Sequence, residues 1–284
     1  MANEAPKFVF YHYQPSEAAA IIFIVVFAIS SLWHIKVLIQ KRTWYFIPFI
    51  LGCLFETVGY VGRALSSTEY PDFTKIPYIM QSILLLLGPT LIAASIYMIL
   101  GRLVVLLEAE SYSMIKPKWL TKFFVLGDVL SFFAQGGGGG ILTQAKTEAD
   151  VRRGEYIIVG GLGIQVLFFG FFIIVTMVFH KRIDRKPTRN AHALDTPWKK
   201  LLYVLYISSA LVMVRSIYRV AEYVLGSDGE LQSKEAYLYC LDALPMLIVA
   251  LAYNWFHPSR VVSRESLRRL SVTSMEVLGQ GQTA

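Results

Sequence analysis

The sequence predicts an all-α fold: a polytopic membrane protein built as one bundle of seven transmembrane helices. Hydrophobic residues make up 55% of the 284-residue chain and charged residues only 17%, well below the charged share of a soluble domain. The mean hydropathy is +0.50. Seven apolar runs are each long enough to cross a hydrocarbon core of about 30 Å. The stretches between them are too short to form a separate soluble domain.

The seven spans are expected at residues 18–39, 46–65, 76–107, 122–143, 156–179, 200–225 and 236–256. The segment Pro15–Glu17 precedes the first span and is typical of a helix start. The third span is overlong and contains Gly88-Pro89, which predicts a kink or a tilt. His257-Pro258 is expected to end the seventh span.

The fourth and fifth spans are rich in glycine. Gly136–Gly140 are five consecutive glycines in the fourth span, and Gly160–Gly163 contribute three more in the fifth. Small residues let two helices approach closely in a membrane, and this packing role is the expected one. The alternative is local unwinding that exposes backbone amides to the head group of a ligand.

Three regions follow along the chain: an extracellular N-terminal segment (1–17), the seven-helix domain (18–257) and a basic cytoplasmic tail (258–284). This orientation rests on the positive-inside rule. Of the 27 Lys and Arg residues, 18 fall in the first, third and fifth loops and the tail, and 7 fall on the other side. The net charge of +7 therefore reflects topology, and we expect no nucleic-acid partner. An anchor at the outer interface is expected from the aromatic residues Phe8, Phe10, Tyr11 and Tyr13.

The sixth span carries three ionisable residues, Arg215, Arg219 and Glu222, inside a run that is otherwise apolar. A charge near the centre of a transmembrane helix costs about 2.5–3.5 kcal/mol or more. The three residues fall at i, i+4 and i+7 and share one helix face, where the two arginines repel each other. Acids on other helices must therefore face them.

The second span places Glu56, Tyr60 and Arg63 on one helix face. Glu56 and Arg63 are about 10 Å apart along the helix axis, too far for an ion pair, so their partners must lie elsewhere. The charged residues expected at comparable depth, with Glu56 beneath them, are Arg63, Arg215, Arg219, Glu222 and Asp242. We therefore predict a substrate-binding polar cavity in the outer half of the bundle, between the second, sixth and seventh spans.

The fourth span adds Asp128 and Gln135 to the predicted substrate-binding residues. Asp128 is expected in the cytoplasmic half, so the polar lining would run past the midplane, as a path for a crossing substrate does. The alternative is that the buried charges are salt bridges that only fix helix packing. Four buried acids against three arginines are more than packing needs, which favours the cavity.

Neither metal nor covalent chemistry is indicated. The five histidines include no His-x-x-x-His pair, and only His34 is well inside a span, whereas a zinc hydrolase needs several ligands around one metal. We predict no enzyme activity and no resident cofactor, with haem binding left open. Cys53 and Cys240 both lie in apolar runs, so no stabilising external disulfide is expected.

Several polar motifs follow one another in a specific order. They are Glu56-x-x-Gly59-Tyr60-x-x-Arg63, Gln81 with Gly88-Pro89 and Tyr97, Asp128 with Gln135 and the glycine run, Arg215-x-x-Tyr218-Arg219-x-x-Glu222, then Glu235, Tyr239 and Asp242, and finally His257-Pro258. In this order and spacing the chain resembles, over nearly its whole length, the fungal RTA-like lipid-translocating exporters, which are seven-helix membrane proteins. Ser259 stands where that family pattern has Gly.

The resemblance implies export or flipping of amphiphiles such as sphingoid long-chain bases, resistance to toxic sterols and drugs, and in one branch protoporphyrin or haem traffic. We predict a plasma-membrane transporter or translocase for such an amphiphile, without ATP hydrolysis of its own. Buried acids suit an ammonium head group, and buried arginines suit phosphate or carboxylate. The alternatives are a receptor-like sensor and a haem- or porphyrin-binding protein that moves nothing. Expected partners are the amphiphile, membrane lipids and a second copy of the chain.

Overall fold

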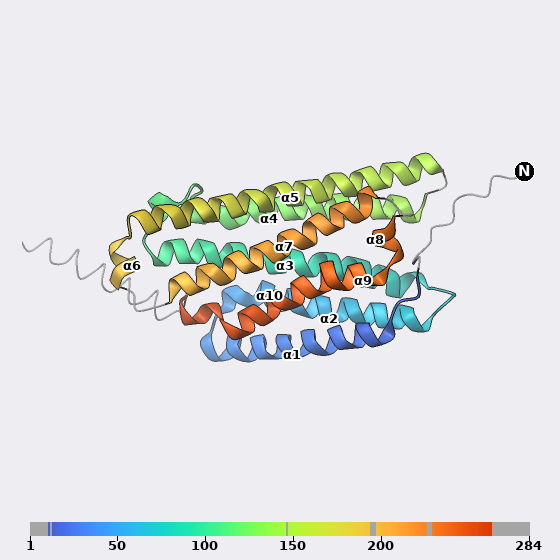
Figure 1. Ribbon diagram of the computed structural model, residues 1–284, viewed down its shortest axis with the longest axis horizontal. Coiled ribbons are helices and arrows are strands. Elements are labelled where there is room, and N and C mark those ends of the chain that lie inside the picture. Colours follow the sequence, from blue (N-terminus) through green and yellow to red (C-terminus); the bar gives the residue numbers. More distant parts are fainter. Residues whose placement is uncertain (1–10, 12, 146, 194–196, 226–228, 263–284) are drawn as a thin grey trace, which may run out of the picture.

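The computed structural model describes residues 11, 13–145, 147–193, 197–225 and 229–262 (Figure 1). Within these residues the chain forms helices and turns and contains no strand, which confirms the all-α prediction. The long helices run side by side along the long axis of the molecule (Figure 1). Phe8, Phe10 and the predicted tail after residue 262 lie outside the described residues.

Every predicted span is helical. The long helices are α1 (Glu17–Lys41), α2 (Ile47–Thr68), α3 (Lys75–Leu106), α4 (Pro117–Thr143), α5 (Glu148–Arg185) and α7 (Trp198–Val224). The last span is made of three consecutive pieces: α9 (Glu235–Leu238), the π-helical turn η3 (Tyr239–Ala243) and α10 (Leu244–Trp255). The short elements are η1 (Trp44–Phe46), η2 (Glu110–Tyr112), α6 (Arg189–Ala193), α8 (Glu230–Ser233) and η4 (Pro258–Arg260).

Within the part of the chain that the structure describes, six helical segments are long and apolar enough to cross a membrane. They are Glu17–Lys41, Trp44–Thr68, Lys75–Leu106, Glu148–Arg185, Trp198–Val224 and Glu235–Arg260. Helix α4 is long enough, but five glycines and polar residues such as Asp128 and Gln135 dilute its apolar content. It nevertheless lies along α5 for most of its length (Figure 1). The seventh span therefore stays a prediction.

Helix α5 is longer than its predicted span of 156–179. Thr147 and Asp150 form a capping box at its start, in which the Thr147 hydroxyl accepts from the Asp150 N–H at 3.2 Å. Such a box satisfies backbone N–H groups that the first turn leaves free. The polar ends of α5 thus stay helical beyond the apolar run from which the span was predicted.

Helices α4 and α5 meet through backbone contact at one glycine of the five-glycine run. A Cβ atom on Gly138 would lie 2.7 Å from the carbonyl oxygen of Gly154, so only glycine fits there. The other four glycines of the run face open space. Helix α4 is continuous through all five, so the structure supports the packing interpretation at Gly138 and shows no unwinding.

The last span is interrupted by the π-turn η3, which the sequence did not predict. Pro245 follows this turn in the first turn of α10. A proline has no N–H to donate to the carbonyl four residues earlier, and its ring crowds that carbonyl. The wider π-turn relieves this conflict and is a feature often found at functional sites. It contains Asp242.

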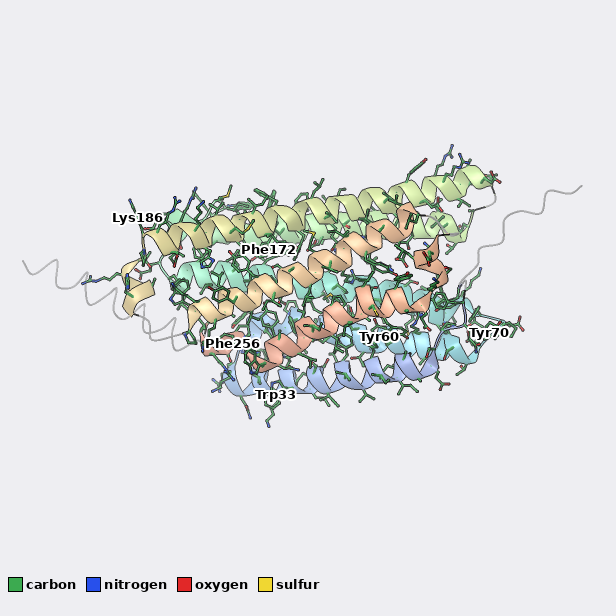
Figure 2. All side chains as sticks on the ribbon, in the orientation of Figure 1. Trp33, Tyr60, Tyr70, Phe172, Lys186 and Phe256 are labelled. Atoms are coloured by element: carbon green, nitrogen blue, oxygen red, sulfur yellow. The ribbon has the colours of Figure 1, made fainter. Side chains whose placement is uncertain are left out.

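A cluster of aromatic rings closes the end of the bundle that carries Trp33 and Phe256 (Figure 2). We call it the aromatic cluster: His34, Phe46, Phe49, Tyr253 and His257, all buried. The rings of Phe46 and Phe49 stack at 4.4 Å, and the two imidazoles lie 5.7 Å apart between centroids. The cluster joins α1, η1, α2, α10 and the turn that follows α10.

Candidate functional site

Tyr60 lies between the aromatic cluster and the end of the bundle that carries Tyr70 (Figure 2), and a group of charged side chains lies near it. We call this group the polar cluster: Glu56, Arg63, Arg215, Arg219, Glu222, Glu235 and Asp242. Helices α2, α7 and α9 and the turn η3 contribute its members. All but Arg219 and Glu235 are buried, and those two are half-buried. Five of the predicted site residues on three predicted spans thus come together, and Arg63 lies beside them.

Arg63 joins α2 to α9 and to the N-terminal segment. Its Nη2 donates to the Glu235 carboxylate at 2.6 Å and to the Tyr13 hydroxyl at 2.8 Å, and its Nε donates to the Tyr239 hydroxyl at 3.1 Å. The rings of Tyr11, Tyr13 and Tyr239 surround the guanidinium at 5.3–5.8 Å, close enough for cation–π attraction. Burial raises the pKa of the Tyr13 phenol, so this hydroxyl stays protonated while it accepts from Arg63.

Arg215 joins α7 to η3 and α3. Its guanidinium forms an ion pair with Asp242, and both side chains are almost fully buried. The Nη2 atom also donates to the backbone carbonyl of Leu85 at 2.7 Å. That carbonyl lies four residues before Pro89 and has no helical N–H partner, because proline lacks one. Arg215 therefore satisfies an acceptor that Pro89 leaves open.

Arg219 lies one turn further along α7 and pairs with Glu222 at 2.8 Å. It also lies 3.9 Å from the second carboxylate oxygen of Asp242, so Asp242 faces both arginines of α7. The Tyr218 hydroxyl donates to Glu222 at 3.4 Å. The Arg219 side chain keeps 16% of its surface exposed, which makes it the more accessible of the two arginines.

Glu56 is the acid of the cluster that has no ion pair. It is 2% exposed, and its carboxylate makes no hydrogen bond or ion pair with any residue that the structure describes. The charges of Arg215, Asp242 and Arg219 act on it from α7 and η3. On α3 it faces Gly88, where an added Cβ would lie 3.0 Å from Oε1.

Tyr60 lies in an aromatic stack beside the polar cluster. Its ring stacks on Phe23 at 5.3 Å and on Phe27 at 6.0 Å, both from α1. The charges of Glu56 and Arg63 act on its hydroxyl from either side. The stack separates the charges from the lipid-facing side of α1, whose Ile22 and Ile29 are exposed.

Asp128 and Gln135 lie apart from the polar cluster, on α4. Asp128 is buried beside the Tyr97 hydroxyl of α3, and its oxygens make no hydrogen bond of ordinary geometry with the described residues. Gln135 donates to Ser131 at 2.6 Å and to Gln165 of α5 at 3.4 Å. No contact among the described residues links these groups to the arginines, so the continuous polar track stays a prediction.

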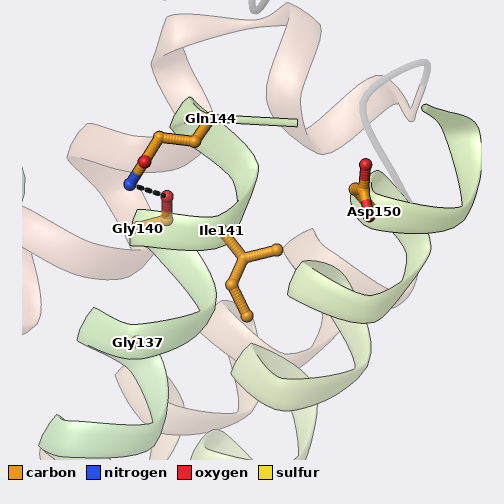
Figure 3. Close-up of a pocket in the computed structure, with 5 residues that line it drawn as sticks. All are labelled: Gly137, Gly140, Ile141, Gln144 and Asp150. Atoms are coloured by element: carbon orange, nitrogen blue, oxygen red, sulfur yellow. Dashed lines mark hydrogen bonds between the residues drawn. The ribbon is translucent and has the colours of Figure 1, made fainter. Parts of the chain in front are cut away.

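A shallow surface hollow lies at the glycine-rich end of α4 and α5 (Figure 3). It has a volume of about 480 Å³ and is lined by Gly137, Gly140, Ile141, Gln144 and Asp150. Gln144 folds back and donates to the Gly140 carbonyl at 3.2 Å (Figure 3). No residue of the polar cluster lines this surface hollow. The predicted cavity between α2, α7 and η3 therefore stays a prediction.

Sequence reasoning missed several partners of the predicted site residues, among them Glu235, Tyr13, Tyr239 and the Leu85 carbonyl. Glu235 stands at the start of the last span, where an acid indicates a helix N-terminus and gives no sign of an ion pair. Tyr13 was expected in the outer interface, yet its hydroxyl binds Arg63. The missing helical partner of the Leu85 carbonyl is a consequence of Pro89 that the sequence does contain.

A protein-family model described as RTA1-like protein matches residues 49–265. The chain belongs to this family. Protoporphyrin uptake protein 1 of Saccharomyces cerevisiae is 39% identical to it, over 89% of this chain and 93% of that protein. The match confirms the family resemblance predicted from the polar motifs. Together with six helical segments apolar enough to span a bilayer, it identifies an integral membrane protein.

Two further relatives of the chain carry names of transporters. The probable lipid transporter atnI of Emericella nidulans is 30% identical, over 88% of this chain and 67% of that protein. The sphingoid long-chain base transporter RSB1 of Saccharomyces cerevisiae is 27% identical, over 83% of this chain and 69% of that protein. No solved structure matches the chain.

Proposed function

We propose that this protein binds an amphiphile and moves it across the membrane, as an exporter or flippase without ATP hydrolysis of its own. The polar cluster carries the proposal. Three arginines and four acids come together from α2, α7 and the last span, inside helices apolar enough to cross a bilayer. Ionisable groups at such depth are costly and mark substrate pathways in membrane proteins.

The proposed substrate is a sphingoid long-chain base, a sterol-like molecule or a related lipid. The names of two relatives, a sphingoid base transporter and a probable lipid transporter, support this choice. The head group would lie in the polar cluster, and the tail would lie along apolar side chains at the bundle surface. The predicted contribution of Asp128 and Gln135 would extend the path along α4.

The proposed topology has seven spans, with α4 as the fourth, the N-terminus outside and the C-terminus in the cytoplasm of a plasma-membrane protein. The packing of α4 along α5 supports its inclusion. Basic residues of the loops support the orientation. They gather at the ends of α1, α3, α5 and α7 that lie nearest the aromatic cluster, and include Lys41, Arg102, Arg182 and Lys199.

In the structure each arginine of the polar cluster is paired with an acid. A bound head group must therefore replace one member of a pair. An ammonium group would take the place of a guanidinium, and a phosphate or carboxylate would take the place of an acid. Arg219 is suited to this exchange because its side chain is 16% exposed. Loss of the contacts between α7 and η3 would open the cluster at the same step.

The test is transport by purified protein in liposomes. A radiolabelled C18 sphingoid base is added to the inner leaflet, and its appearance in the outer leaflet is measured by extraction with albumin. The wild type is expected to exceed empty liposomes clearly, and Arg219→Gln is expected to lower the protein-dependent rate about tenfold. The matched control is Glu110→Gln, an exposed acid in η2.

Absence of protein-dependent flux for sphingoid bases and sterols alike would overturn the transport proposal. Saturable binding of the labelled base by the same preparation, without flux, would then favour a receptor-like sensor. Normal flux in folded Arg219→Gln protein would exclude the polar cluster as the path.

A porphyrin is the second candidate substrate. The relative named protoporphyrin uptake protein 1 is 39% identical over 89% of the chain, and arginines suit the two carboxylates of protoporphyrin. Titration of the purified protein with protoporphyrin, followed by porphyrin fluorescence, tests this candidate. Binding that weakens about tenfold in Arg219→Gln supports it, and unchanged fluorescence on titration excludes it.

A further inference from the structure

The arginines of the polar cluster are matched one to one with acids. The pairs are Arg63 with Glu235, Arg215 with Asp242, and Arg219 with Glu222. Glu56 is left over. Its carboxylate is buried and makes no hydrogen bond or ion pair with the residues that the structure describes. An ionised Glu56 would therefore give the polar cluster one uncompensated negative charge.

Among the residues that the structure describes, the surroundings of Glu56 supply no further counter-ion. Charged groups act on it from α7, where Arg215 and Arg219 are already paired, and from η3, where Asp242 adds a like charge. The titratable neighbours on its own helix are Cys53 and Tyr60. On α3 the carboxylate faces Gly88, which offers no side chain at all.

Ionisation of a buried carboxylate without a counter-ion is strongly unfavourable. The cost disappears when the carboxylate holds a proton or when a cation binds beside it. Gly88 lets the α3 backbone pack closely against the carboxylate, because an added Cβ would lie only 3.0 Å from Oε1, so a bound head group must displace part of this packing. The charge of Glu56 can therefore be neutralised by a proton or by a bound cation, but not by both at once.

We propose that Glu56 is a common binding site for a proton and for the head group of a cationic amphiphile, and that the protein exchanges one for the other. This inference rests on the proposed transport function and names its substrate class, its coupling ion and its exchange residue. A cationic head group that binds from the cytoplasm displaces the proton of Glu56 into the cytoplasm. After release of the amphiphile outside, a proton from the exterior takes its place. One proton enters for each singly charged amphiphile that leaves, and no covalent bond changes.

The first test measures proton displacement in the purified full-length protein. The probe is dodecyltrimethylammonium below its critical micelle concentration, because a quaternary ammonium carries a fixed charge and cannot itself exchange protons. In weakly buffered detergent solution near neutral pH, its binding is expected to release up to about one proton per protein, and its affinity is expected to fall as the pH is lowered. The proton is followed with a pH-indicator dye.

Three variants sharpen this test. Glu56→Gln keeps the shape and removes the exchangeable proton, so proton release should vanish and cation affinity should fall about tenfold or more. Glu56→Asp keeps a carboxylate and should restore both effects in part. The exposed Glu110→Gln variant should behave as the wild type. Thermal melting of each variant establishes that it is folded.

The second test measures uptake of the same probe, in radiolabelled form, into proteoliposomes that contain right-side-out and inside-out protein. An interior more acidic than the medium is expected to drive accumulation above that of empty liposomes in the wild type and not in Glu56→Gln. Flux that ignores the pH gradient, together with binding that releases no proton, would overturn the exchange at Glu56. That result would leave the proposed transport function intact, whereas absence of flux for every amphiphile would remove the transport function itself.

Discussion

The two ends of the bundle bury ionisable side chains in opposite ways. The polar cluster matches each guanidinium to a specific acid or hydroxyl from another element or a later turn. The aromatic cluster encloses two imidazoles in phenyl and phenol rings, and the His34 ring lies 5.0 Å from that of Phe49. Fixed charges need definite partners, whereas ring contacts share their stabilisation among many neighbours. Substitutions should therefore be most damaging in the polar cluster, and only there should they alter the handling of a charged ligand.

The largest effect is expected from Arg215→Met. It leaves Asp242 buried without its main counter-ion and removes the donor to the Leu85 carbonyl. Breaking a buried pair in this way costs about 3–5 kcal/mol, which thermal unfolding in detergent will report as a marked fall in midpoint. The double variant Arg215→Met/Asp242→Leu should recover most of the loss, because it removes the carboxylate that the single variant leaves without its counter-ion. A single variant as stable as the wild type would mean that the pair is not buried as described.

A smaller effect is expected from Tyr13→Phe at the outer rim of the same cluster. The change removes the hydroxyl that accepts from Arg63 at 2.8 Å, and hydrogen bonds to charged groups contribute about 1.5–3 kcal/mol. Tyr11→Phe is the matched comparison, because its hydroxyl donates to the uncharged Gln81 amide oxygen at 2.9 Å and should matter less. Limited proteolysis of the N-terminal segment, together with thermal unfolding, measures both. Equal effects of the two variants would argue against a special role of the Arg63 charge.

Helices α4 and α5 pack in a third way at Gly138, through direct backbone contact. Gly138→Ala places a methyl group 2.7 Å from the Gly154 carbonyl oxygen, and overpacking of this kind costs about 1–3 kcal/mol. Its neighbour Gly139 faces open space, so Gly139→Ala should cost nothing or stabilise the helix by up to about 1 kcal/mol. Thermal unfolding midpoints of the two variants, measured under the same conditions, show whether only Gly138 requires glycine. A similar loss in both would show that α4 needs glycine for another reason.

The sequence predicted the helices and the meeting of most of the buried charges, because both follow from the cost of placing polar groups in hydrocarbon. Buried Arg215 and Asp242 each need a counter-ion, and they form an ion pair with each other. The pairing of Arg63 was not predictable in the same way. Glu235, the acid that pairs with Arg63, stands where the sequence indicates a helix N-terminus. Tyr13, whose hydroxyl accepts from Arg63, comes from a segment with no periodic pattern. The π-turn at Asp242 depends on how Pro245 is accommodated, a choice between several backbone solutions that only the packed structure resolves.

A small loss of stability is expected from His34→Leu in the aromatic cluster, and this variant tests the contrast between the two clusters most directly. The change removes one hydrogen bond, from the imidazole Nε2 to the Ala250 carbonyl at 3.3 Å, worth about 0.5–1.5 kcal/mol. The rings of Phe46, Phe49 and Tyr253 still pack around the new side chain. Flux of the sphingoid base per folded molecule should therefore equal that of the wild type, while Arg219→Gln lowers it about tenfold at unchanged expression. If His34→Leu abolished flux without unfolding the protein, the aromatic cluster would belong to the pathway, and the contrast between the two ends would be wrong.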